Sequence, residues 1–133
     1  MGNFVGDYTS IAIGADGLAV ISYHDLTASS LKVAKCSNID CTAALVTTVD
    51  DPTSGNAVGS YTSIAIGSGG FPVISHWDNT AFAVKVAACA NPGCTGPSAN
   101  TTVDDLTSGG SHTAIGVGID GLPIVAYRGD SNS

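Results

Sequence analysis

The residues best suited to chemistry recur where a repeated apolar segment ends. They are Tyr23, His24 and Asp25, then His76, Trp77 and Asp78, then Tyr127 and Arg128. Aromatic rings can stack on the apolar faces of sugars, while carboxylates accept protons from hydroxyl groups. In a ring these side chains would gather on one rim, where they are candidates for binding a ligand. The alternative is that they cap strand ends and turns, and recur because the fold recurs.

The elements that position this rim belong to an internal repeat. The segment 6–23 returns as 59–76, and a looser copy occupies 110–127. A repeat of roughly 50 residues is typical of arrays in which each unit buries its apolar face against a neighbour. The chain has no Glu or Gln and is rich in Gly, Ser, Thr, Val, Ile and Ala. This composition disfavours helices and predicts an all-β protein.

Alternation of apolar and small residues predicts four short strands in each complete repeat. The first repeat has them at 10–14, 18–23, 30–36 and 45–50. The equivalent later strands include 71–76, 83–89, 100–104 and 122–127. Asp16-Gly17 suits the tight turn of the first hairpin, because such turns require positive φ angles.

Four antiparallel strands per repeat are typical of a β-propeller blade. The motif at 11–23, Ile-Ala-Ile-Gly-Ala-Asp-Gly-Leu-Ala-Val-Ile-Ser-Tyr, resembles bacterial β-propeller repeats that are loosely related to sialidase-like blades. The resemblance covers almost the whole chain and implies a fold. It implies no sialidase activity, because the chain lacks both the Trp-Asp signature of common blades and a full Asp-box.

We expect a single repeat domain over 1–133, with about two and a half blades. Blade 1 covers about 7–58, blade 2 about 59–109 and a half blade about 110–127, followed by a tail at 128–133. Propellers typically have about four to eight blades, so this number cannot close a ring. Closure by homodimerisation is the expected solution. The alternatives are a piece of a longer protein and a compact β-sandwich.

Two cysteine pairs with equal spacing occur between the third and fourth strands of each complete repeat. They are Cys36 with Cys41, and Cys89 with Cys94. Residues at the ends of a short hairpin loop can reach the Cα separation of a disulfide, so two such bridges are expected. The alternative is a zinc site with four thiolates. Disulfides favour a secreted, periplasmic or cell-surface protein, although the first six residues lack the features of a secretion signal.

The Asp-Asp-x-Thr-Ser-Gly loops at 50–55 and 104–109 offer oxygen ligands of the kind that calcium prefers. They lack the dense alternating carboxylates of a calcium loop, and an Asx turn explains the same residues. We therefore expect neither a metal nor another cofactor.

The charge pattern restricts the partners. The formal net charge is −7, and only four Lys and Arg residues oppose eleven Asp. A nucleic-acid partner is not expected, because phosphate binding needs a basic surface. The apolar runs are strand-sized, so no membrane-spanning segment is expected.

Three function classes remain. A non-catalytic module that binds glycans or a protein surface fits best, because repeated carboxylates such as Asp25 and Asp78 indicate repeated structure more than an asymmetric catalytic centre. The second class is a structural or assembly repeat without a small ligand. The third is a glycosidase-like enzyme that uses Asp residues of the rim.

Overall fold

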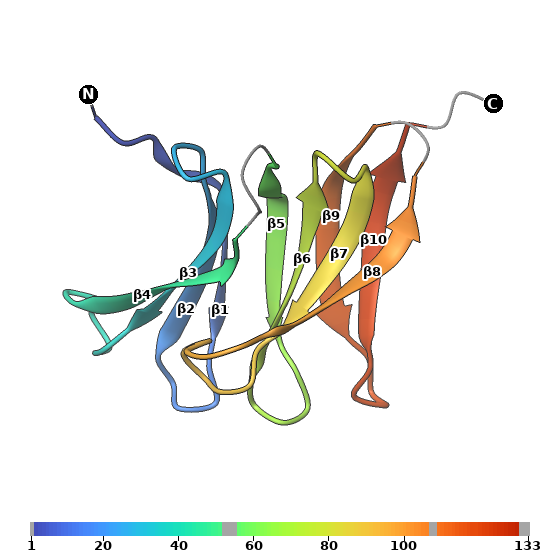
Figure 1. Ribbon diagram of the computed structural model, residues 1–133. Coiled ribbons are helices and arrows are strands. Elements are labelled where there is room, and N and C mark those ends of the chain that lie inside the picture. The colour runs from blue at the N-terminus through green and yellow to red at the C-terminus, as the bar shows by residue number, and fades with distance from the viewer. Residues whose placement is uncertain (1, 52–55, 107–108, 131–133) are drawn as a thin grey trace.

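The chain folds into antiparallel β-sheets, as a computed structural model that describes residues 2–51, 56–106 and 109–130 shows (Figure 1). The strands are β1 (Val5–Ile13), β2 (Ala19–Asp25), β3 (Ser30–Cys36), β4 (Ala44–Asp50), β5 (Val58–Ile66), β6 (Pro72–Asp78), β7 (Ala83–Ala88), β8 (Ala99–Asp105), β9 (Gly110–Val117) and β10 (Pro123–Gly129). The described residues contain no helix. The prediction of an all-β protein is therefore confirmed.

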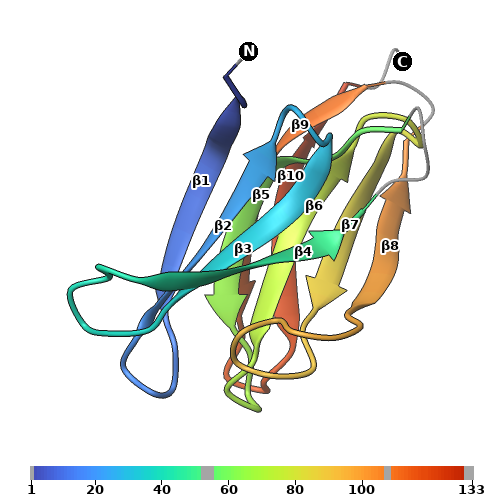
Figure 2. The same cartoon turned by 60° about the vertical axis from the view of Figure 1, so that its left-hand side comes forward.

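The strands form three sheets that follow the repeats. The first sheet has the order β1-β2-β3-β4, the middle sheet β5-β6-β7-β8, and the short sheet contains β9 and β10. Figures 1 and 2 show the sheets side by side, with β5 between β1 and β9. We call β1, β5 and β9 the inner strands. The described residues by themselves form no closed ring.

The inner strands are longer than the alternation predicts. β1 begins at Val5 and not at Ser10, because its pairing with β2 continues through two irregularities, between Val5 and Asp7 and between Asp7 and Ser10. Gly6 has a φ of 93° at this place, a conformation that glycine adopts without steric cost. The equivalent part of β5 has the same irregularities.

Side-chain hydroxyl groups join each sheet to the next. Thr62 of β5 donates a hydrogen bond to Ser22 Oγ of the first sheet over 2.9 Å. The hydroxyl groups of Thr113 and Ser75, one repeat later, are 2.7 Å apart. Repetition of the same contact shows that the short sheet packs on the middle sheet as the middle sheet packs on the first.

The core lies between the first and middle sheets. Its members are Val20, Leu31, Val33, Val49, Ile64, Ile74, Ala87, Cys89 and Cys94, with Ala12 and Ile66 packed against them. Because these residues come from two sheets, neither sheet buries its apolar face alone.

Both expected disulfides are present. Cys36 pairs with Cys41 and Cys89 with Cys94, each with a Cα–Cα distance of 4.9 Å. Their surroundings differ, because Cys94 is buried in the core whereas Cys41 is exposed. Two such bridges are compatible with an oxidising compartment.

This difference predicts unequal costs for removing the two bridges. Closing either short loop contributes about 2 kcal/mol in the chain-entropy model. Replacing Cys89 and Cys94 by Ala should lower the free energy of unfolding by more than replacing Cys36 and Cys41, because both cysteines of the second bridge are buried in the core, whereas only Cys36 of the first bridge is buried. Urea denaturation of the two double variants would measure the difference. Equal losses would contradict a packing role for the second bridge.

Candidate functional site

The residues of the predicted rim occupy the ends of β2, β6 and β10, but most of them are not accessible. The exposed fractions of His24, Asp25, His76, Trp77 and Asp78 are all below 5%. Tyr23 is half-buried, whereas Tyr127 and Arg128 are exposed. The sheets thus bring equivalent residues to equivalent places without presenting them together to solvent.

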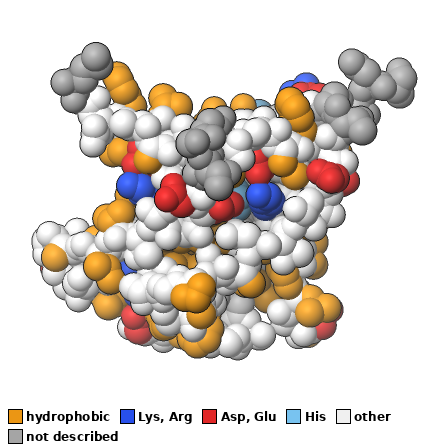
Figure 3. All heavy atoms as spheres, viewed as in Figure 1, with side chains coloured by type: hydrophobic (Ala, Val, Ile, Leu, Met, Phe, Trp, Pro, Cys, Tyr) orange, Lys and Arg blue, Asp and Glu red, His pale blue; other side chains and the backbone are white. Residues whose placement is uncertain are grey.

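The two buried carboxylates hold local structure. Asp25 accepts a hydrogen bond from the Ala28 amide and forms an ion pair with Lys32 at 2.8 Å. Asp78 accepts bonds from the Thr80 and Ala81 amides and pairs with Lys85 at 2.6 Å. On the face seen in Figure 3, basic side chains lie directly beside acidic ones. Both pairs therefore fix the turn after the second strand and its contact with the third.

Trp77 fills the space between the middle and short sheets. Its exposed fraction is 2%, and a Cβ added at Gly110 would lie 2.8 Å from its ring. Gly110 is therefore required by close approach of the indole. Ligand stacking on Trp77 stays a prediction, and the ring has a packing role in this structure.

His76 is fully buried and lies with its Nε2 3.6 Å from Asp50 Oδ2 of the first sheet. Burial lowers the pKa of His76 to about 4, and burial also raises the pKa of Asp50. Both shifts favour the uncharged forms. We therefore regard the contact as a packing contact with a neutral imidazole and not as a salt bridge.

Three aromatic rings of the inner strands form a continuous row. Tyr8, Tyr61 and His112 occupy equivalent positions of the three repeats. The ring centroids are 4.4 Å apart between Tyr8 and Tyr61 and 4.7 Å apart between Tyr61 and His112, with tilted planes. We call these three side chains the aromatic row. Tyr8 and His112 are exposed, and Tyr61 is half-buried between them.

The backbone of the aromatic row is strained. The φ angles are 52° at Tyr8, 52° at Tyr61 and 53° at His112. Side chains other than that of glycine rarely adopt this region, and such residues cluster at ligand sites. The three residues with this backbone conformation are the ones whose rings lie next to one another on the inner strands.

Polar groups accompany the rings. A hydrogen bond with the Tyr61 side chain raises the pKa of Tyr8, and the charge of Asp7 raises it further. His112 Nδ1 lies 2.8 Å from Ser111 Oγ. The row thus combines apolar ring faces with hydroxyl, imidazole and carboxylate groups at its edge.

Sequence reasoning missed the aromatic row. The repeat does contain the signal, since Gly6, Gly59 and Gly110 each precede an aromatic residue by two positions. The alternation predicts a first strand that begins at Ser10 and so excludes Tyr8, whereas the irregular pairing extends β1 past Tyr8.

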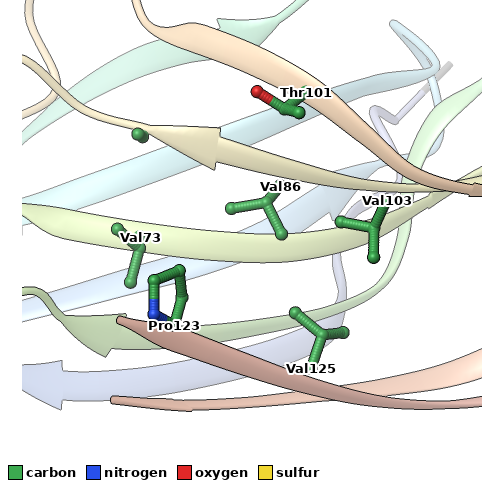
Figure 4. A pocket seen from close by; sticks show the side chains of 7 residues that line it. Val73, Val86, Thr101, Val103, Pro123 and Val125 are labelled. Atoms are coloured by element: carbon green, nitrogen blue, oxygen red, sulfur yellow. The ribbon is translucent and has the colours of Figure 1, made fainter. Parts of the chain in front are cut away.

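An apolar groove of about 420 Å³ lies between the middle sheet and β10 (Figure 4). Its lining residues are Val73, Val86, Ala88, Thr101, Val103, Pro123 and Val125. Val103 is 48% exposed, whereas the equivalent Val49 is 8% exposed. The first sheet is covered there by the connection between β7 and β8, where Ser98 donates a hydrogen bond to the Val49 carbonyl. The groove offers few polar groups to orient a polar ligand.

Among residues 2–51, 56–106 and 109–130, no group of three or more His, Cys, Asp or Glu side chains is arranged to hold a metal ion. The central residues of the candidate calcium loops, at 52–55 and 107–108, lie outside the described residues. The same described part has no helix long and apolar enough to cross a membrane.

Comparison with known proteins gives no assignment: no family model matches the chain, and no curated protein matches it.

Burial of His76 predicts acid sensitivity. The imidazole has a pKa of about 4 when folded and about 6.5 when unfolded, so the unfolded chain binds more protons between these values. The contribution of the neutral His76 imidazole to the free energy of unfolding should be fully present above pH 6.5. It should fall by about 3 kcal/mol as the pH approaches 4. The raised pKa of Asp50 has the opposite sign and offsets part of this loss at the acid end.

Urea denaturation at several pH values would test this. His76→Tyr removes this imidazole and should reduce the slope, and tyrosine already occupies the equivalent positions 23 and 127. Burial also lowers the pKa of His24, so part of the slope should remain. His112→Gln, at an exposed histidine, is the matched control and should keep the profile. An unchanged slope in His76→Tyr would contradict the assignment.

Proposed function

We propose that the protein is a non-catalytic binding module for neutral glycans. The observation that carries this proposal is the aromatic row, in which strained backbone presents three rings from three equivalent strands. Flat ring faces stack on the apolar faces of sugars, and the neighbouring hydroxyl and imidazole groups can bond sugar hydroxyls.

The negative net charge of the chain favours neutral glycans over acidic ones. The net charge of −7 repels acidic polysaccharides at long range, so a neutral ligand fits better. A glycosidase would need two carboxyl groups across the scissile bond. The charge of Asp7 raises the pKa of Tyr8, and the equivalent positions of the other repeats carry Ser60 and Ser111. The repeats thus supply no second equivalent carboxylate beside the row, which favours binding over hydrolysis.

The same proposal includes the wider architecture. The sheets are blades of a β-propeller, the chain supplies about two and a half of them, and a second copy closes the ring. The inner strands would then surround the axis and carry the aromatic rows of both copies. The disulfides favour a secreted, periplasmic or cell-surface location.

Isothermal titration with neutral hexasaccharides of glucose, differing in linkage, tests the binding function. Tyr61→Ala should weaken the affinity for a bound sugar about tenfold, because it removes the central ring of the row. Tyr61→Phe should retain most of the affinity, since the ring remains.

Phe71→Ala is the matched control, because Phe71 is an exposed aromatic side chain outside the row. It should leave the affinity unchanged. Equal affinities of Tyr61→Ala and the parent chain, with both folded by circular dichroism, would overturn the assignment. Release of reducing sugar would favour an enzyme instead.

A further inference from the structure

The internal repeat shows which surfaces of the described chain stay uncovered, because the middle sheet shows the exposure of a sheet that is covered. Its face toward the first sheet contains Ile64, Ile74, His76 and Ala87, all below 10% exposed. The equivalent face of the first sheet has no preceding sheet in the described structure. We call this the free face of the first sheet, defined by Ile11, Ile13, Ile21 and Tyr23.

The apolar residues of the free face are far more exposed than their equivalents in the middle sheet, which another sheet covers. Ile11 is 63% exposed, whereas the equivalent Ile64 is 6% exposed. Ile13 is 62% exposed, whereas Ile66 is packed against the core. The pairing of Ile11 with Ile21 places both on one surface. Uncovered apolar surface of this kind marks an interaction site.

The short sheet has the complementary uncovered surface. We call it the outer face of the short sheet, defined by Ala114, Gly116, Ile124, Ala126 and Arg128, which are all exposed. The equivalent residues of the first sheet include Val20, Ser22 and His24, which the middle sheet covers to below 5% exposed. One chain therefore carries both halves of an interface that it forms twice internally.

Charge distinguishes this interface from the internal ones. Arg128 replaces His24 and Trp77 at the equivalent positions, and Asp7 replaces Ser60 and Ser111. Trp77 reaches the residue next to Ser111, namely Gly110. By the same placement, Arg128 would reach Gly6 of a second copy, beside its Asp7. Arg128 pairs with Asp130 of its own chain over 2.9 Å, and the approach of Asp7 of a second copy would add another opposite charge beside the guanidinium group.

We propose that the outer face of the short sheet packs on the free face of the first sheet of a second copy, in the register of the internal sheet contacts. The inference rests on the ring closure proposed above and adds the register. Ala126 would face Thr9 of the second copy, as Ser22 faces Thr62. His112 would lie beside Tyr8 of the second copy, so the aromatic row continues across the interface. Two reciprocal contacts then close the ring.

Cross-linking tests the register. The hydroxyl oxygens of Ser22 and Thr62 are 2.9 Å apart, so cysteines at two such positions lie close enough for a disulfide after small adjustment. Thr9→Cys/Ala126→Cys should oxidise to a covalent dimer with two bridges. Each single variant should stay uncross-linked, and an equimolar mixture of the single variants should give a dimer with one bridge.

Light scattering of the parent chain separates the two proposals. Its mass should be twice 13.1 kDa. A dimer in which the double-cysteine variant fails to cross-link would overturn the register but leave the ring closure standing. A monomer would overturn both, and a ladder of larger cross-linked species would overturn closure by two copies. Glycan titration stays a separate readout of the aromatic row.

Two substitutions test the contacts without cysteines. Ala126→Ser restores the hydroxyl that Ser22 and Ser75 provide internally, and should tighten the dimer dissociation constant about tenfold, since the ring contains the contact twice. Ala90→Ser, at another exposed alanine, is the control and should leave it unchanged. A dissociation constant for Ala126→Ser equal to that of the control would overturn the register.

A charge exchange tests the pairing of Arg128. Arg128→Asp should weaken the dimer because it places like charges together, and the additional change Asp7→Arg should restore it. Failure of this rescue, with both variants folded, would overturn the contact between residues 128 and 7.

Discussion

The structure depends on the burial of one sheet by the next. The contact of Ile64 with the face that contains Val20 and Val33 turns two half-exposed sheets into one core. Ser22 and Thr62 fix the register of that contact, because a hydrogen bond between buried hydroxyl groups is lost if the sheets slide. The spacing of the rings on the inner strands depends on this register.

Local chemistry made much of the fold predictable. The strand 30–36 and both disulfides depend on residues close in sequence, and they appear as expected. The first hairpin turn differs from the expected two-residue turn, because Gly17 has a positive φ, Asp16 does not, and the connection extends from Gly14 to Leu18. Burial of the predicted rim was not predictable in the same way. Whether Trp77 faces solvent or Gly110 depends on the neighbouring sheet, which a single repeat does not reveal.

The aromatic row could not be predicted from the sequence for a related reason. Strand alternation ends at Ser10, and the irregular pairing beyond it places Tyr8 on the inner strand only through a left-handed backbone conformation. An alignment of the three repeats on Gly6, Gly59 and Gly110 places an aromatic residue two positions after each glycine. The contact between rings could still not be read, because it joins residues about 50 positions apart.

The left-handed residues of the aromatic row also bear on how stability would trade against the proposed binding. A glycine at position 8, 61 or 112 would adopt the observed φ without the steric cost that tyrosine and histidine incur there. Relief of strain at these positions would therefore come with loss of a ring. Selection for a more robust fold and selection for the row would act on the same three residues in opposite directions.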